Sequence, residues 1–463
     1  MTFRAYNPTT GELVQDVASL NAQQREALLA ATHLQQQSWR RRTIAERAPF
    51  VRALSGTLRH HREALAAMLT LEMGKPITAA RAEIDKCAML CELAPDMAER
   101  ALADEILLDD ATASVRVRHD PLGTVLAIMP WNFPHWQALR FAIPALLAGN
   151  GVLIKPAGSV PGSALLLNQC FLEARDAVRG IDVAEAPIHI ALFDLEALDA
   201  VIADARIVGV TLTGSDRAGR HVAEVAGAHL KKVVLELGGS DPFVVLPGAD
   251  VSRAATVAVA ARTVNTGQSC IAAKRFIVCD GIYDEFLSQF IDGMAQLILG
   301  DPRDERTQIG PIATKSVRDG LAVQVETSVR MGARVAFAGT RSTSAGYFYP
   351  PTVLVDIPEN APAAHQELFG PVASVFRVAD VSAAIAKANN SSFGLGASVW
   401  SQDAATIQHC IAELDAGMVF VNDMVASDPR FPFGGIKQSG VGRELGPAGF
   451  REFTNAKTVY VRR

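Results

Sequence analysis

The chain has few cysteines, no long apolar run and no large excess of charge of either sign. Its six cysteines are spread over 463 residues without a CxxC pair, so we expect free thiols rather than a disulfide framework. The longest apolar candidate, residues 141–154, is interrupted by Pro144 and by Gly149-Asn150-Gly151, whereas a membrane-spanning helix needs roughly 18 uninterrupted residues. The first residues also lack the apolar core of a signal peptide. These absences predict a cytoplasmic protein that does not enter a membrane.

Charge and histidine patterns exclude two further classes of partner. The 44 basic and 49 acidic side chains give a net charge of −5, and the longest basic run is the three arginines 40–42. A nucleic-acid-binding protein would carry a basic surface, so we expect no nucleic-acid partner. His60 and His61 are adjacent in a predicted helix and therefore point in different directions. We predict no metal site, because no second pair has the spacing of metal ligands.

The pattern of apolar residues predicts an α/β fold. Apolar residues recur at helical spacing in 21–42, 45–73 and 78–102, and residues 113–118 alternate like a half-exposed strand. Beyond Pro121, short apolar runs alternate with helical stretches, which is typical of parallel sheets covered by helices on both faces. Residues 238–242 (Gly-Gly-Ser-Asp-Pro) are of types that break regular structure, and they separate two such series. We therefore predict a domain boundary there. The tail 454–461 reads as a lone strand that needs a partner, often in another subunit, and residues 431–446 look too irregular for an element.

Three polar residues lie on turns or at a strand end, where α/β folds commonly carry catalytic side chains. Cys270 lies in a polar, glycine-containing turn, where a thiol can act as a nucleophile, although most cysteines are inert small apolar residues. Glu236 ends a buried strand, where burial raises the pKa of a carboxyl and suits it to accept a proton from water. An exposed strand-end acid is the alternative. Asn132 lies between Pro130 and Pro134, so its fixed amide can donate to an oxyanion, or it can simply form a turn.

Two weaker patterns indicate nucleotide binding. In residues 213–219, small residues including Gly214, Ser215 and Gly219 follow an apolar strand and open a helix, whose N–H groups can bind a pyrophosphate. The spacing is not the GxGxxG of the common dinucleotide fingerprint. Lys155 ends another apolar strand and can reach ribose hydroxyls, or it can be merely solvated.

These segments occur together in an order that resembles the aldehyde dehydrogenase superfamily over nearly the whole chain. The matching segments are eight short motifs: Leu71-Glu72-Met73-Gly74-Lys75-Pro76, residues 130–134, Lys155-Pro156, Thr213-Gly214-Ser215, Leu235-Glu236-Leu237-Gly238-Gly239, Gly267-Gln268-Ser269-Cys270, Glu367-Leu368-Phe369-Gly370-Pro371 and Pro432-Phe433-Gly434-Gly435. The resemblance implies two doubly wound Rossmann-like α/β domains and a small β oligomerisation element. It assigns 1–102 and 122–238 to nucleotide binding, 239–447 to catalysis, and 103–121 with 448–463 to a ribbon and tail that join a homodimer or homotetramer.

The resemblance also implies a mechanism. Cys270 attacks an aldehyde, the Asn132 amide and the Cys270 N–H hold the oxyanion, hydride passes to NAD or NADP, and Glu236 activates the water that hydrolyses the thioester. A positively charged nicotinamide favours the thiolate of Cys270, whereas ionised Glu236 opposes it.

The resemblance to the superfamily also implies a set of cofactor-binding residues. Lys155 and Glu367 bind the two riboses, and Phe369 packs by the nicotinamide ribose. The remaining positions are Gly214, Ser215 and Gly219 at the pyrophosphate, and Trp131 and Gly158. Gly158 departs from the pattern, because many NAD-preferring relatives carry there a glutamate that repels a 2′-phosphate. Either nucleotide is therefore expected.

The substrate class is predicted from Arg140 and from residues 265–276, which resemble the shorter bacterial-type succinate semialdehyde dehydrogenases. Arg140 occupies the place of a substrate-binding arginine in succinate semialdehyde dehydrogenases, and its guanidinium can pair with the carboxylate of a short acid semialdehyde. An ion pair with an acidic residue on the domain surface is the alternative. Arg430 is a poorer candidate at the tunnel mouth, and Val264 stands where some of those enzymes have a second arginine.

Several other functions stay open at this point. They are a dehydrogenase for a neutral aliphatic or aromatic aldehyde, a coenzyme A-acylating dehydrogenase, an amidase or thioesterase that uses Cys270 without nucleotide, and a structural protein that keeps the fold without turnover. Glu236 argues against the acylating enzyme, since relatives of that kind generally lack a carboxylate there.

Overall fold

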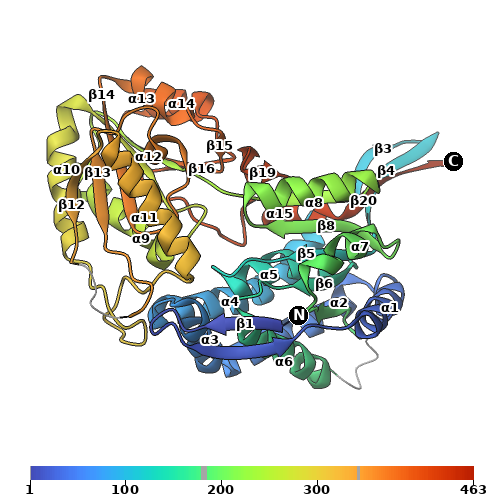
Figure 1. The fold of residues 1–463 in the computed structure, drawn as a ribbon. Helices are drawn as coiled ribbons and strands as arrows, with labels where there is room; N and C mark the ends of the chain where they lie inside the picture. Colours follow the sequence, from blue (N-terminus) through green and yellow to red (C-terminus); the bar gives the residue numbers. More distant parts are fainter. Residues whose placement is uncertain (1, 179–184, 341–344) are drawn as a thin grey trace.

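A computed structural model describes residues 2–178, 185–340 and 345–463 of the chain. Two helix-covered β-sheets lie side by side, and a narrow β arm projects from one of them (Figure 1). This arrangement confirms the prediction of two doubly wound α/β units with a small β element. The assignment of one unit to nucleotide binding and the other to catalysis stays a prediction.

The first sheet has six strands in the order β19-β9-β8-β5-β6-β7. Five of them run parallel, and β19 is antiparallel to β9. Their bounds are β5 (Thr124–Ile128), β6 (Gly151–Lys155), β7 (Ile188–Ile190), β8 (Ile207–Thr213), β9 (Lys232–Glu236) and β19 (Gly440–Val441). The apolar runs that predicted these strands are mostly buried, because helices cover both faces of a parallel sheet.

Among the described residues, the helices that pack on this sheet include α1 (Ala22–Trp39), α2 (Ile44–His60), α3 (Arg62–Met73), α4 (Ile77–Ala101), α5 (Pro134–Leu147), α6 (Pro161–Ala177), α7 (Leu198–Ala203) and α8 (Asp216–Ala228). The largest apolar cluster of the chain joins α2, α4, α5 and α6 to strands β5 and β6, with members such as Leu54, Ile84, Leu146 and Val152. This core fixes the positions of α5 and α6 on the sheet.

The second sheet has seven strands in the order β12-β13-β14-β11-β10-β16-β17, all parallel except β12. Its strands are β10 (Pro242–Val245), β11 (Arg275–Cys279), β12 (Arg334–Ala338), β13 (Thr352–Val355), β14 (Val372–Val378), β16 (Gly396–Trp400) and β17 (Met418–Val421). The helices are α9 (Val251–Thr263), α10 (Asp280–Ala295), α11 (Lys315–Arg330), α12 (Pro362–His365), α13 (Val381–Asn389) and α14 (Ala404–Glu413). The chain passes from the first sheet to the second between Glu236 and Pro242, within the glycine- and proline-containing segment 238–242.

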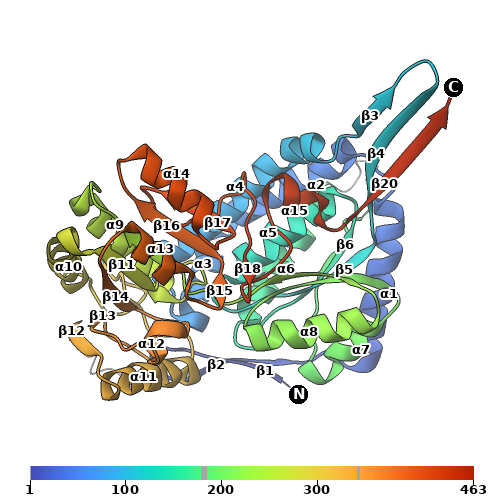
Figure 2. The same ribbon diagram turned by 90° about the horizontal axis from the view of Figure 1, so that it is seen from above.

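Small β structures lie outside the two large sheets. A hairpin of β1 (Thr2–Tyr6) and β2 (Leu13–Ala18) lies at the N-terminus. The projecting arm contains β3 (Glu105–Asp109), β4 (Ala113–Pro121) and β20 (Thr454–Arg462), and α15 (Gly446–Glu452) leads into β20. Figure 2 shows this arm extending well beyond the helices.

Two expectations about secondary structure need correction, and a third, that the tail strand has a partner, is confirmed. The helix predicted over 45–73 is two helices, because the backbone leaves the helical region at His61 (φ −93°, ψ 13°). The segment 431–446 contains two short strands, β18 (Ile436–Lys437) and β19, where β18 pairs with β15 (Phe393–Gly394). The tail strand β20 pairs antiparallel with β4 of its own chain, with Thr454 opposite Pro121. Its partner is therefore found within the same polypeptide.

None of the helices in the part of the chain that the structure describes is long and apolar enough to cross a membrane. All six cysteines are free thiols, and only Cys270 is less than fully buried.

Candidate active site

A cavity of about 270 Å³ lies between the two sheets, at the carboxyl ends of strands of the first sheet. Open parallel sheets generally bind ligands at this edge. Seven of the predicted site residues line it: Trp131, Asn132, Gly214, Ser215, Cys270, Glu367 and Phe369. Residues from distant parts of the sequence therefore share one cavity, while their chemical roles stay predictions.

Asn132 is joined to the cysteine loop by hydrogen bonds in both directions. Its side-chain amide donates to the carbonyl oxygen of Gln268 at 3.0 Å, and its own backbone carbonyl accepts from the Asn265 amide at 2.9 Å. Asn265 also donates to the Gln268 carbonyl at 3.2 Å. These bonds fix the Asn132 amide relative to Cys270, as the stabilisation of an oxyanion between them requires.

The loop before Cys270 has a constrained backbone. Asn265 and Thr266 have positive φ angles of 52° and 59°, which residues other than glycine rarely adopt. Gly267 has φ 75°, and a Cβ there would collide with the carbonyl oxygen of Gly370. The surrounding structure must hold this conformation, and such constraint is common where a fold positions a reactive group.

The Cys270 thiol is half-buried, and burial raises its pKa to about 12. The positive charges of Arg140 and Lys274 oppose this rise, whereas Glu367 and Glu236 add to it. The thiol is therefore protonated at neutral pH in the protein alone. A further positive charge in the cavity would lower the pKa and produce the nucleophilic thiolate.

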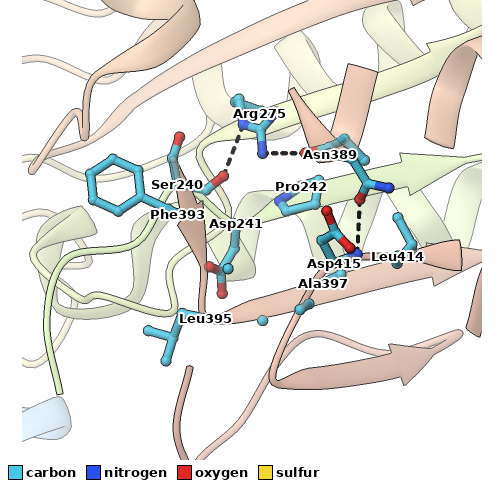
Figure 3. A pocket seen from close by; sticks show the side chains of 14 residues that line it. Ser240, Asp241, Pro242, Arg275, Asn389, Phe393, Leu395, Ala397, Leu414 and Asp415 are labelled. Carbon is cyan, nitrogen blue, oxygen red and sulfur yellow. Dashed lines mark hydrogen bonds between the residues drawn. The ribbon is translucent and has the colours of Figure 1, made fainter. Parts of the chain in front are cut away.

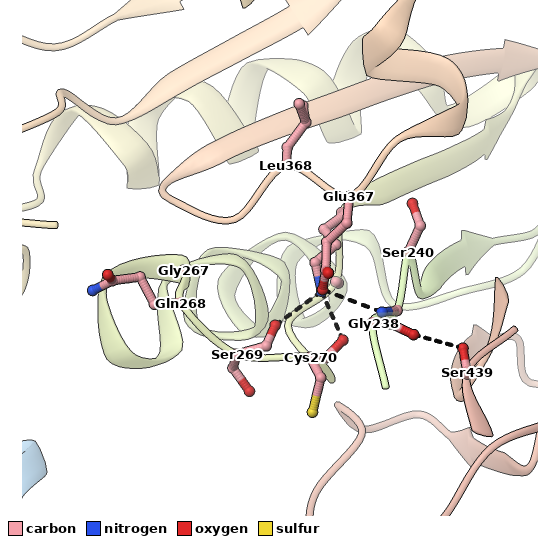
Figure 4. A network of polar contacts seen from close by, with 12 residues as sticks. Gly238, Ser240, Gly267, Gln268, Ser269, Cys270, Glu367, Leu368 and Ser439 are labelled. Atoms are coloured by element: carbon pink, nitrogen blue, oxygen red, sulfur yellow. Dashed lines mark hydrogen bonds and ion pairs between the residues drawn. The ribbon is translucent and has the colours of Figure 1, made fainter. Parts of the chain in front are cut away.

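Figure 4 shows Glu367 beside Ser269 and Cys270. Lys274 links Cys270 to Glu367. Its buried ammonium group donates to the carbonyl oxygens of Ser269 at 2.9 Å and Cys270 at 2.6 Å, and lies 3.3 Å from Glu367 Oε1. The N–H of Gly239 donates to the same carboxylate oxygen at 3.2 Å. Glu367 is thus held at the cavity wall by groups on both sides.

Glu236 lies next to this cavity but does not line it. It ends strand β9, is 1% exposed, and a Cβ at Gly434 would lie 2.6 Å from its Oε1. Burial raises its pKa well above the usual value, and Arg140 opposes this shift. Neither carboxyl oxygen has a hydrogen-bond partner among the described residues. A carboxyl group in this environment has the raised proton affinity expected of a general base.

The residues predicted to bind the pyrophosphate divide into two groups. Ser215 caps helix α8 by accepting from the Ala218 N–H at 3.3 Å, and both Ser215 and Gly214 line the cavity. Gly219 does not line it, and a Cβ at Gly219 would lie 2.6 Å from Leu237 Cδ2. This glycine lets α8 pack closely on the segment after β9, so its contribution to binding would be indirect.

Two aromatic side chains form one wall of the cavity. The rings of Trp131 and Phe369 pack edge to face with centroids 5.7 Å apart. Lys155 and Gly158 lie outside the lining residues. The Lys155 ammonium is 5.7 Å from the Phe193 ring centre, and burial lowers its pKa.

Arg140, the predicted substrate-binding arginine, is engaged within the protein, and its role toward a substrate stays a prediction. Arg140 is 2% exposed and forms an ion pair with the equally buried Glu444. Its guanidinium carbon lies 4.4 Å from the Phe433 ring centre, and Nη2 is 3.4 Å from Thr213 Oγ1. An ion pair with an acidic residue, the alternative considered for Arg140, is therefore present, although it is buried rather than on the domain surface.

Arg430 is also engaged elsewhere. Its exposed guanidinium binds Asp428, two residues earlier, with an N–O distance of 2.7 Å. Neither Arg140 nor Arg430 lines the cavity around Cys270.

Several residues of the site were not found from the sequence. Gln137, Leu237 and Val317 line the cavity, and Lys274 organises the cysteine loop. The only local signal was a lysine following the small residues Ala272-Ala273. Its role depends on Glu367, which no local pattern connects to it.

A second buried acid, Asp241, lies just before strand β10 of the second sheet. Asp241 borders a small cavity of about 10 Å³ next to Leu395 and Ala397 (Figure 3). Burial raises its pKa to about 7, and Lys274 opposes the shift. The neighbouring Arg275 is occupied by the carbonyl oxygens of Ser240 and Ala388 at 2.9 and 2.8 Å.

Comparison with known proteins identifies the family. The model of the aldehyde dehydrogenase family matches residues 1–459. The chain belongs to the aldehyde dehydrogenase family.

Among described residues 2–178, 185–340 and 345–463, no three His, Cys, Asp or Glu side chains are grouped so that they could hold a metal ion.

Individual relatives in this family are similar over their full length. The succinate-semialdehyde dehydrogenase [NADP(+)] 1 of Mycobacterium ulcerans is 44% identical over 466 residues, covering 100% of both chains. Its Mycobacterium tuberculosis counterpart is 44% identical over 464 residues, again with 100% coverage of each. The crystal structure of succinic semialdehyde dehydrogenase from Streptococcus pyogenes with NADP+ superimposes with a TM-score of 0.94, at 33% identity and 100% coverage of both chains.

Proposed function

We propose that the chain oxidises succinate semialdehyde, or a similar short acid semialdehyde, to the carboxylic acid with NADP or NAD as the hydride acceptor. One observation carries this proposal: Cys270 and Asn132 line the same cavity, with buried Glu236 beside it. The substrate class is supported by the full-length similarity to the mycobacterial and streptococcal enzymes. The Arg140 guanidinium is paired with Glu444, and its contact with a substrate carboxylate stays a prediction.

The cavity fits a nicotinamide nucleotide. It joins the capped start of α8, where N–H groups favour phosphate, to the Trp131 and Phe369 rings and to the Glu367 carboxylate, which can accept from ribose hydroxyls. Lys155 and Gly158, at the end of the neighbouring strand β6, would hold the adenosine ribose. No acidic side chain stands at position 158 to repel a 2′-phosphate, so NADP is accepted along with NAD.

The residues of the chain then carry out the chemistry in two stages. The Cys270 sulfur attacks the aldehyde carbon, and the Asn132 amide and Cys270 N–H donate to the oxyanion of the thiohemiacetal. An oxidised nicotinamide held near Trp131, Phe369 and Glu367 would supply the hydride acceptor, and the hydride lost from the thiohemiacetal carbon would leave a thioester on Cys270. Glu236 takes a proton from water, the resulting hydroxide attacks the thioester carbon, and the acid leaves as the thiol is restored.

A comparison of substrates and nucleotides tests this proposal. We expect kcat/KM to be highest for succinate semialdehyde, lower for glutarate semialdehyde, and lowest for a neutral aliphatic and an aromatic aldehyde, each measured with NADP and NAD. Greater activity on the neutral or aromatic aldehydes would contradict the substrate class. The absence of nucleotide reduction with every aldehyde would contradict the dehydrogenase itself.

Assembly into a homodimer or homotetramer through the β arm is also part of the proposal. The arm exposes apolar side chains, with Ile106 68%, Leu107 57% and Tyr460 63% exposed, and its two edge strands β3 and β20 are open to pairing. Sedimentation velocity should give at least a dimer, and the Leu107→Lys variant should shift it toward monomer. A monomeric wild-type protein would contradict this assembly.

A cytoplasmic location completes the proposal, since a reducing compartment keeps the Cys270 thiol available for attack. Fractionation of cells that produce the protein tests this location.

A further inference from the structure

The segment Leu71-Glu72-Met73-Gly74-Lys75-Pro76 is one of the motifs that this chain shares with the aldehyde dehydrogenase family. None of its residues lines the cavity around Cys270. It forms the junction between α3 and α4, where Gly74 ends α3 in the left-handed conformation (φ 73°). Glu72 and Lys75 on either side of this glycine are both 1% exposed. Burying a charged side chain is unfavourable unless it is paired or hydrogen-bonded, so the partners of these two residues indicate what the segment does.

Glu72 binds the start of helix α6. That helix begins at Pro161, which has no N–H, and the side chain of the preceding Val160 cannot cap it. The next two N–H groups, of Gly162 and Ser163, donate to Glu72 Oε1 at 2.7 Å and Oε2 at 2.8 Å. The Ser163 hydroxyl also donates to Oε2, at 2.7 Å. A Cβ at Gly162 would lie 2.8 Å from Glu72 Oε1, so the close approach requires glycine.

The start of helix α5 repeats this arrangement with a different carboxylate. It begins at Pro134 after Phe133, which likewise provides no side-chain cap. The next two N–H groups, of His135 and Trp136, both donate to Glu83 Oε1 at 3.0 Å. The other oxygen of Glu83 accepts from Lys75, whose ammonium lies 3.8 Å from the centre of the Phe133 ring.

The two capped helices follow neighbouring strands of the first sheet. Strands β5 and β6 are parallel, with Ile128 opposite Lys155. The turn from β5 to α5 carries Asn132, and the turn from β6 to α6 carries Lys155 and Gly158. Helix α4, with Glu83, packs against α5, and helix α3, with Glu72, packs against α6. Each turn is therefore fixed at its far end by one buried carboxylate from a separate helix.

We propose that Glu83, held by Lys75, positions the Asn132 turn for oxyanion binding, and that Glu72 positions the 155–160 turn for nucleotide binding. This inference rests on the proposed function, from which it takes the roles of the two turns. Each carboxylate makes charge-assisted hydrogen bonds to N–H groups that would otherwise be buried without a partner. Asn132 stands only two residues before Pro134, so a shift of the helix start would move its amide, and a misplacement of about 1 Å can lower the rate roughly 100-fold.

Isosteric variants of the two carboxylates test the separation of roles. For Glu83→Gln we expect kcat to fall roughly 10- to 100-fold, with the Kd for NADP+ changed less than about threefold. For Glu72→Gln we expect the Kd for NADP+ to rise roughly tenfold or more, with a much smaller effect on kcat at saturating nucleotide. Quenching of tryptophan fluorescence measures the Kd without turnover, since Trp131 lines the cavity.

A matched control comes from the same helix as Glu83. Glu92 also lies on α4 and also accepts hydrogen bonds, from Ser55 and Arg59, but it caps no helix of the sheet. Glu92→Gln should change neither kcat nor the Kd. If Glu72→Gln and Glu83→Gln lower kcat and raise the Kd in equal proportion, the carboxylates serve only stability and the inference is overturned.

A double-mutant cycle shows whether Glu83 acts through Asn132. In an Asn132→Ala background, Glu83→Gln should lower kcat less than about threefold further, because the amide that it positions is gone. An unchanged, multiplicative effect in that background would overturn the positioning role. If Glu83→Gln does not fold because Lys75 is left unpaired, the Lys75→Met/Glu83→Gln variant removes both charges and should show the same loss of kcat. The wild-type protein is assayed alongside, and its failure to reduce nucleotide would count against the proposed function instead.

Discussion

Arg140 and Glu444 form a buried ion pair although 304 positions separate them in the sequence. The pair lies close to Glu236 and Cys270, whose charges both act on Arg140. Burial raises the pKa of Glu236, the Arg140 guanidinium lowers it and the Glu444 carboxylate raises it, so the pair acts on the predicted base with both signs of charge. The substrate contact predicted for Arg140 stays a prediction.

Removing Arg140 should mainly reduce stability. Arg140→Ala leaves the Glu444 carboxylate buried without its counter-charge, which typically costs about 3–5 kcal/mol. Urea denaturation of the variant and the wild type measures this loss. A variant with wild-type stability but a selectively raised KM for acid semialdehydes would contradict this expectation and restore the substrate-binding role.

Cys270 should be a slow nucleophile until a positive charge enters the cavity. Because burial raises the pKa of the thiol to about 12, alkylation by iodoacetamide should increase with pH up to at least about pH 10. Saturating NADP+ should accelerate alkylation at neutral pH, whereas the reduced nucleotide should not. Cys270→Ala should abolish both alkylation at this site and oxidation, while nucleotide binding persists. Normal turnover by that variant would remove the nucleophile assignment.

Replacing Glu236 should arrest the reaction after hydride transfer. Glu236→Gln cannot take a proton from water, so we expect a burst of one reduced nucleotide per subunit followed by slow turnover. The raised pKa of Glu236 in the wild type implies that thioester hydrolysis accelerates with rising pH as the carboxylate forms. Rapid-mixing absorbance of the reduced nucleotide measures both. Undiminished steady turnover, or an unchanged pH profile in the variant, would count against the base.

Asp241 should make the fold less stable as the pH rises. Its pKa is about 7 in the folded chain, against about 4 when unfolded, so the folded state binds the proton more tightly. The stability contributed by the protonated acid is complete below about pH 4 and is lost as the pH rises through about 7. Asp241→Asn should therefore gain stability relative to the wild type between about pH 5 and pH 8, by roughly 3 kcal/mol, since each tenfold difference in proton affinity corresponds to about 1.4 kcal/mol. Urea denaturation at both pH values measures this gain, and a constant difference between the two proteins would contradict the raised pKa.

The sequence by itself determined the elements of the fold and the residue types of the site. Apolar runs such as 152–154 and 233–235 predicted buried parallel strands, because a strand that is buried on both faces consists mainly of apolar residues. The motifs around Asn132 and Cys270 indicated reactive side chains on turns, because proline and glycine restrict or free the backbone locally.

Only the tertiary structure decided which charged groups meet. The partners of Arg140, Glu72 and Glu83 come from other elements, and the tail strand β20 finds β4 within its own chain. A charged residue must be paired once it is buried, but any residue of opposite charge or any free N–H group can satisfy it. The choice among these partners depends on how the helices pack on the sheet, which is a property of the whole fold rather than of any local pattern.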